Sequence, residues 1–161
     1  MGNPRKIDFL IFMACIALLG VGFYMQYIME LKPCYLCITQ RFFLALIGLF
    51  SILAFVHNRA TRIYGSVVAL SAILGAYFAS KQLWLQSLPP DKVPACGPSV
   101  DYLFNAFNFS EALRMLLQGD GNCAAIQWTF LGLSIPGWTL VYFLGVTALS
   151  VLKIIRGNHK C

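Results

Sequence analysis

The sequence predicts an all-α membrane protein built as a four-helix bundle, and three observations indicate this class. Apolar residues make up 59% of the 161 residues and charged residues only 11%, whereas soluble domains carry about 25% charge. Four stretches are long and apolar enough to cross a bilayer, which takes about 20 residues. Basic residues gather on one side of these stretches and acidic residues on the other, as expected for a multi-pass membrane protein.

The predicted spans account for nearly the whole chain, so we expect one transmembrane domain over residues 1–161. The first span, 9–29, has 21 residues without a charge. We do not expect it to be a cleaved signal peptide, because a signal core is about 7–15 residues long and ends at a small-residue cleavage site. The second span contains one charge, Arg41, near its start. The remaining spans are predicted at about 36–56, 63–80 and 130–152.

The charges predict the orientation of the bundle. Seven of the twelve basic residues lie in short segments on one side, namely Arg5, Lys6, Arg59, Arg62, Lys153, Arg156 and Lys160. Five of the six acidic residues lie on the other side, namely Glu30, Asp91, Asp101, Glu111 and Asp120. The positive-inside rule then places both termini in the cytoplasm and the loops at about 30–36 and 81–129 outside. The net charge of +6 is therefore a topology signal, and no nucleic-acid partner is expected.

The long third loop contains a candidate short helix over residues 111–118. Ser110 is a suitable N-cap, and Gly119 is placed to end the helix. Its leucines would share one face, which predicts an amphipathic helix lying on the bilayer surface. The alternative is a helix packed against the outer mouth of the bundle.

The six cysteines divide according to the predicted topology. Cys34 and Cys37 form a C-x-x-C motif at the mouth of the second span, and Cys96 and Cys123 lie in the third loop. These four are all predicted to be external, where disulfides persist. The other two differ: Cys15 lies inside the first span, where it would act as a small apolar residue, and Cys161 is the last residue.

The C-x-x-C motif at a helix start favours thiol chemistry. A helix N-terminus offers unpaired N–H groups and a partial positive charge, which stabilise a nearby thiolate. Arg41 follows Cys37 by four residues and shares its helix face, so it could stabilise that thiolate or a bound anion. The alternative role for Arg41 is a surface anchor. A structural disulfide also remains open for the two cysteines.

No metal site is expected, because four-cysteine zinc sites usually contain two short-spaced pairs and Cys96 and Cys123 are far apart. The chain has no dinucleotide-binding or nucleotide-binding loop and no haem attachment motif. The C-x-x-C motif does lie at a depth that a lipid-soluble carrier reaches. A quinone is therefore the simplest electron acceptor.

Two segments resemble the disulfide bond formation protein B (DsbB) family. They are LKPCYLCITQR at 31–41 and GNCAAIQWTFLGLSIPGW at 121–138. The resemblance extends over essentially the whole chain. It implies an enzyme of the bacterial inner membrane, a protein-dithiol:quinone oxidoreductase with its active site on the periplasmic side. Its partner would be a DsbA-type thioredoxin-fold oxidase, and its cofactor ubiquinone or menaquinone.

The resemblance implies a role for each matched residue. The reduced partner would attack Cys96, and the released Cys123 would attack Cys34. Cys37 would then leave as a thiolate beside the quinone, which Arg41 would help to bind. Four cysteines allow three pairings, and on this resemblance we expect Cys34–Cys37 and Cys96–Cys123 at rest, with Cys34–Cys123 as the exchange intermediate.

The chain departs from the family pattern in places. Some members carry a histidine near the outer end of the third span, where this chain has Lys81 and Gln82. Gln40 stands where an acid can occur, and Pro98 follows Cys96 closely. These departures bear on quinone affinity and on the choice of partner.

Two other functions compete with this interpretation. An enzyme of the vitamin K epoxide reductase type would carry its C-x-x-C motif on a late helix, whereas Cys34 and Cys37 open the second span. A membrane scaffold with static disulfides would not need Cys37 to cycle.

Overall fold

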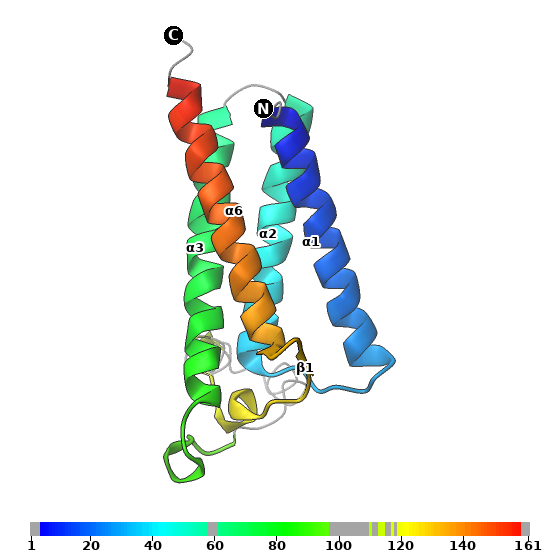
Figure 1. The fold of residues 1–161 in the computed structure, drawn as a ribbon, viewed down its shortest axis with the longest axis vertical. Helices are drawn as coiled ribbons and strands as arrows, with labels where there is room; N and C mark the ends of the chain where they lie inside the picture. Colours follow the sequence, from blue (N-terminus) through cyan, green and yellow to red (C-terminus); the bar gives the residue numbers. More distant parts are fainter. Residues whose placement is uncertain are drawn as a thin grey trace.

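The structure, a computed structural model, describes residues 4–57, 61–96 and 119–158, together with the single positions 110, 113, 114 and 117. Four long helices form a bundle (Figure 1). They are α1 (Pro4–Tyr27), α2 (Tyr35–His57), α3 (Thr61–Gln86) and α6 (Ile135–Asn158). Each contains a stretch long and apolar enough to span a membrane, so the predicted all-α class with four spans is confirmed.

Three short elements lie at the end of the bundle opposite the start of α1 (Figure 1). They are the 3-10 helices η1 (Pro90–Lys92) and η2 (Gly121–Ala124) and a hairpin made of β1 (Thr129–Phe130) and β2 (Leu133–Ser134). The amphipathic helix predicted over 111–118 falls largely outside the described residues. Of its positions, Leu113, Arg114 and Leu117 are helical.

Two helices differ in extent from the predicted spans. Helix α3 continues to Gln86, beyond the span predicted to end at 80, because apolar residues follow Lys81 and this lysine directs its Nζ to the carbonyl of Leu117, at 2.9 Å. The fourth helix begins at Ile135 instead of 130. The preceding residues are extended and pair as a hairpin, with Phe130 opposite Leu133.

The hairpin turn shows why the apolar run does not continue as helix. Leu131 and Gly132 have positive φ angles of 51° and 79°, which reverse the chain in two residues. Trp138 of α6 donates its Nε1–H to the carbonyl of Phe130 at 3.0 Å. This hydrogen bond attaches the hairpin to the first turn of α6.

Helix α3 packs against both α2 and α6, and α1 packs mainly against α2. Close packing of α3 against α6 depends on Gly75, because a Cβ built there would lie only 2.6 Å from the ring of Phe143. Phe143 is fully buried. Small residues at such contacts let membrane helices approach closely, which is a main source of their association energy.

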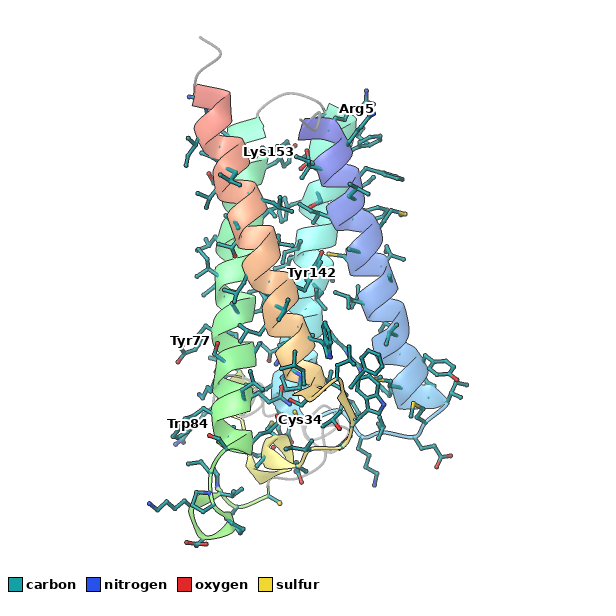
Figure 2. The ribbon with its side chains drawn as sticks, in the orientation of Figure 1. Arg5, Cys34, Tyr77, Trp84, Tyr142 and Lys153 are labelled. Atoms are coloured by element: carbon teal, nitrogen blue, oxygen red, sulfur yellow. The ribbon has the colours of Figure 1, made fainter. Side chains whose placement is uncertain are left out.

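Helices α1 and α6 are joined by a few polar contacts. Lys153 of α6 forms a buried ion pair with Asp8 of α1, and Tyr142 donates its hydroxyl to the carbonyl of Ile11 at 3.1 Å. Figure 2 shows Lys153 near the end where Arg5 marks the start of α1, with Cys34 at the opposite end. Toward that opposite end α1 leans away from α6 (Figure 1).

Candidate functional site

The C-x-x-C motif lies at the N-terminus of α2. Cys34 immediately precedes the helix, and Cys37 lies in its first turn. One helical turn therefore separates the two side chains, and their Sγ atoms are 3.1 Å apart. Cys34 is buried, whereas Cys37 is partly exposed. All five cysteines in the described part of the chain are free thiols in this structure.

A third sulfur joins this pair from a distant part of the sequence. Cys123 of η2 is fully buried and packs with Cys34 and Leu36. Its Sγ is hydrogen-bonded to the Cys34 thiol and to the backbone N–H of Leu36, at the start of α2. The structure thus brings Cys34, Cys37 and Cys123 together.

Hydrogen bonds shift the pKa values of Cys34 and Cys123, which lie outside the predicted spans, in opposite directions. Hydrogen bonding with Cys123 and with Cys37, assisted by burial, raises the pKa of the Cys34 thiol. The bond from Cys34 lowers the pKa of Cys123, although burial opposes this effect. In the reduced protein Cys34 therefore retains its proton while Cys123 ionises readily, which suits Cys123 as a nucleophile.

Asp120 lies directly beside Cys123 and is itself buried. When protonated, the Cys123 thiol donates to Asp120 Oδ1 at 3.4 Å, and the amide of Asn122 donates to the other carboxylate oxygen at 2.6 Å. From the sequence, Asp120 was expected only to contribute to the topology. Its position three residues before Cys123 is the sequence feature that could have indicated this contact.

Cys96 is exposed, unlike the buried Cys34 and Cys123. It nevertheless adjoins the segment that carries Cys123, because Gly121 donates its N–H to the carbonyl of Ala95 at 3.3 Å. A Cβ built on Gly121 would lie 2.3 Å from the carbonyl oxygen of Pro94 and 3.2 Å from Cys96 Sγ. Only glycine permits this approach. One short element therefore connects an exposed cysteine with a buried one.

Gln82 of α3 is the polar side chain that contacts both sulfurs of the C-x-x-C motif. Its Nε2 donates to Cys37 Sγ at 3.2 Å and to Cys34 Sγ at 3.3 Å. Lys81, the other candidate at this end of α3, instead directs its ammonium to the carbonyl of Leu117. Gln82 lies in the part of α3 beyond residue 80. Because the predicted span ended at 80, the sequence did not show where the side chain of Gln82 lies.

Arg41 lies one turn beyond Cys37 on α2 and reaches across to α1. Its guanidinium donates to the carbonyl of Gly22 at 2.9 Å and to the side-chain oxygen of Gln26. It also lies over the ring of Phe23, 5.3 Å from the centroid. A substantial part of its hydrogen-bonding capacity is thus used to bind α1.

A pocket of about 630 Å³ opens between α1, α2 and α6 and extends to the hairpin. Cys37, Arg41 and Gln82 line its polar end. Its walls are otherwise mostly apolar and include Leu18, Val21, Leu44, Trp128, Phe130 and Val141. This volume is in the range of small-molecule sites, which are mainly apolar with a few convergent polar groups.

The two remaining cysteines lie elsewhere. Cys15 is fully buried among α1, α2 and α6, with its Sγ 3.0 Å from the hydroxyl of Tyr142. Cys161 lies outside the described residues. Neither belongs to the sulfur cluster at the pocket.

Comparison with known proteins identifies the family. A family profile described as "Disulfide bond formation protein DsbB" matches residues 4–153. A "Disulfide bond formation protein B" of Hahella chejuensis is 50% identical over 155 residues, covering 94% of each chain. One from Saccharophagus degradans is 47% identical, covering 94% of this chain and 93% of the relative. "Disulfide bond formation protein B 1" of Pseudomonas aeruginosa is 38% identical, covering 97% and 98%. The chain belongs to the disulfide bond formation protein B family.

Proposed function

We propose that this protein is a protein-dithiol:quinone oxidoreductase of the bacterial inner membrane. It reoxidises a DsbA-type thioredoxin-fold oxidase in the periplasm and passes the electrons to a membrane quinone. The observation that carries the proposal is a cluster of three thiols, two of which line an apolar pocket within a four-span bundle.

The exchange begins at Cys96, which is exposed and accessible to a soluble partner. A thiolate of the reduced partner attacks Cys96 in a Cys96–Cys123 disulfide and forms a mixed disulfide, and Cys123 leaves as a thiolate. The partner's second thiol then attacks its own sulfur in the mixed disulfide. This releases the oxidised partner and leaves Cys96 reduced.

The electrons move inward through the buried sulfurs. The Cys123 thiolate attacks Cys34 in a Cys34–Cys37 disulfide, and Cys37 leaves as a thiolate. Burial of Cys123 against Cys34 supports this step, because thiol–disulfide exchange requires direct approach of the attacking sulfur. The two disulfides finally re-form as two electrons and two protons leave the protein.

The pocket fits a quinone. Its apolar walls suit a ring with an isoprenoid tail, and Arg41 at its polar end carries a guanidinium that can donate to a carbonyl oxygen. A quinone bound there would supply the acceptor for two electrons and two protons. Cys34 and Cys37 line the pocket, whereas Cys123 does not. Cys37 is the more exposed of the two, which supports Cys37 as the sulfur that faces the acceptor.

A trapping experiment tests the partner half of the proposal. A partner variant that keeps only its attacking cysteine can open the Cys96–Cys123 disulfide of the oxidised protein but cannot resolve the mixed disulfide, so a covalent complex through Cys96 should accumulate. The matched control is the Cys96→Ser variant of this protein, which should trap nothing. A static scaffold predicts no adduct in either protein.

Quinone dependence tests the other half. The purified protein should oxidise a reduced DsbA-type partner only when quinone is added, and Cys37→Ser should abolish this turnover. Turnover that continues without quinone would refute the assigned acceptor.

Arg41→Ala should raise the apparent KM for quinone, and an unchanged value would exclude Arg41 from the quinone site. Arg41→Lys is the control that retains the charge.

A further inference from the structure

Three uncharged side chains from three helices form a continuous hydrogen-bonded chain that ends on the sulfurs. Thr139 of α6 donates its Oγ1–H to Gln40 Oε1 at 2.7 Å. Gln40 of α2 donates its Nε2–H to Gln82 Oε1 at 2.7 Å. Gln82 in turn donates to Cys37 Sγ at 3.2 Å. We call Thr139, Gln40 and Gln82 the amide relay.

Because the glutamines of the amide relay are buried, each depends on its neighbours in the relay for its hydrogen bonds. Gln40 and Gln82 are each only 3% exposed, so a hydrogen bond that either side chain loses inside the bundle is poorly replaced by water. A buried amide without its partners is costly, which ties the orientation of each glutamine to that of its neighbour. The relay therefore has few acceptable arrangements.

The order of donors and acceptors along the relay determines which group of Gln82, its NH₂ or its carbonyl, faces the sulfurs. With its carbonyl occupied by Thr139, Gln40 presents its NH₂ group to Gln82. The carbonyl of Gln82 then accepts from Gln40 and lies 3.7 Å from Cys37 Sγ. The NH₂ group of Gln82 is closer to the sulfurs and donates to Cys37 at 3.2 Å and to Cys34 at 3.3 Å. The reverse order is possible only if Thr139 turns its hydrogen to the carbonyl of Pro136, at 3.0 Å. That order would direct the partly negative carbonyl of Gln82 at the sulfurs.

When Cys37 is ionised, the two orders of hydrogen bonds differ in stability. Hydrogen bonds to a charged acceptor are roughly twice as strong as neutral ones, so a Cys37 thiolate favours the order in which Gln82 donates. The donor is neutral, so it leaves no uncompensated buried charge when Cys34 and Cys37 are oxidised to a disulfide. An amide also does not titrate, which keeps this donor available at any physiological pH.

We propose that Gln40 and Thr139 are positioning residues that hold the amide N–H of Gln82 toward Cys37 and so stabilise the thiolate that leaves during exchange. The proposal rests on the function proposed above, because it assigns Cys37 as the leaving sulfur. Gln40 and Thr139 act only through Gln82. Thr139 couples the first turns of α6 to the sulfurs, although it touches neither of them.

The test measures the thiolate of Cys37 in the purified full-length protein without quinone and without a partner. In a background in which every other cysteine is replaced by alanine, absorbance near 240 nm at pH 7 reports the thiolate:thiol ratio. Gln82→Leu should lower this ratio about tenfold, since a hydrogen bond to a charged group is lost. Gln82→Glu, of nearly the same shape, should lower it further because its carboxylate repels the thiolate.

Thr139 provides the decisive comparison. Thr139→Val removes the hydroxyl at constant shape and should lower the thiolate:thiol ratio about threefold, the effect of one neutral hydrogen bond. Thr139→Ser restores the donor and should restore the ratio. Thr147→Val is the matched control, because Thr147 lies two turns further along α6 and bonds only its own helix backbone, at Phe143 O.

An equal ratio in Thr139→Val and Thr147→Val, or no rescue by Thr139→Ser, would overturn the proposal. So would an unchanged ratio in Gln82→Leu. These readouts involve no quinone and no partner, so they are independent of the trapping and turnover experiments. A failed relay with intact quinone turnover would leave the proposed function standing, and the converse result would leave the relay standing.

Discussion

Replacing Lys153 with methionine should destabilise the bundle strongly, because it leaves Asp8 buried without its counter-charge. The side chains of Lys153 and Asp8 are only 6% and 10% exposed. Removing one partner of a buried ion pair costs about 3–5 kcal/mol, whereas replacing both by apolar residues is often neutral or stabilising. The single variant should therefore lower the folding equilibrium constant by roughly two hundred- to five thousand-fold.

The free energy of unfolding in detergent micelles, measured by circular dichroism during a denaturant titration, would check this value. The double variant Asp8→Leu/Lys153→Met should recover most of the loss. Lys6→Met removes an exposed lysine at the same end of α1 and should cost under about 0.5 kcal/mol. The reasoning is refuted if Lys153→Met costs no more than Lys6→Met, or if the double variant is as unstable as the single one.

Three further outcomes are expected. Gly75→Ala should destabilise the bundle by about 1–3 kcal/mol in the same unfolding assay, because the new methyl group would overlap the ring of Phe143; a neutral effect would show that α3 and α6 separate easily. Cys34→Ala removes the main donor to Cys123, so the pKa of Cys123 should rise toward its usual value and its thiolate fraction at pH 7 should fall; the ¹³Cβ chemical shift of Cys123 during a pH titration would report this, and an unchanged or lower midpoint would contradict it. Leu131→Asn should slow amide hydrogen exchange in the hairpin, because asparagine adopts the positive φ of this position more readily than leucine; faster exchange would show that the leucine side chain stabilises the turn.

The sequence was sufficient to predict the four spans, because an apolar run of about 20 residues with at most one charge matches the thickness of a bilayer and is rare in soluble domains. It was less reliable for helix ends. Lys81 suggested that α3 had left the membrane, yet a lysine tolerates the membrane surface by extending its ammonium to polar groups. The hairpin was missed because its apolar residues are continuous with those of α6, and hydropathy does not distinguish an extended segment from a helix.

The site was predictable only where its residues are close in sequence. The spacing of Cys34 and Cys37 predicts sulfurs on neighbouring positions of one helical turn, and Arg41 follows on the same face. The approach of Cys123 to Cys34 depends on how η2 packs against α2, and no local pattern reports that contact. Gln40 and Gln82 are 42 residues apart, so only the packing of α2 against α3 makes them partners. The catalytic roles assigned to the four cysteines stay predictions.

The ion pair between α1 and α6 has a consequence for biosynthesis. Its two partners are separated by 145 positions, so the helix that contains Asp8 is made first and the helix that contains Lys153 last. The two charges can therefore pair only once the last helix lies beside the first, and this buried ion pair is among the late contacts of the bundle.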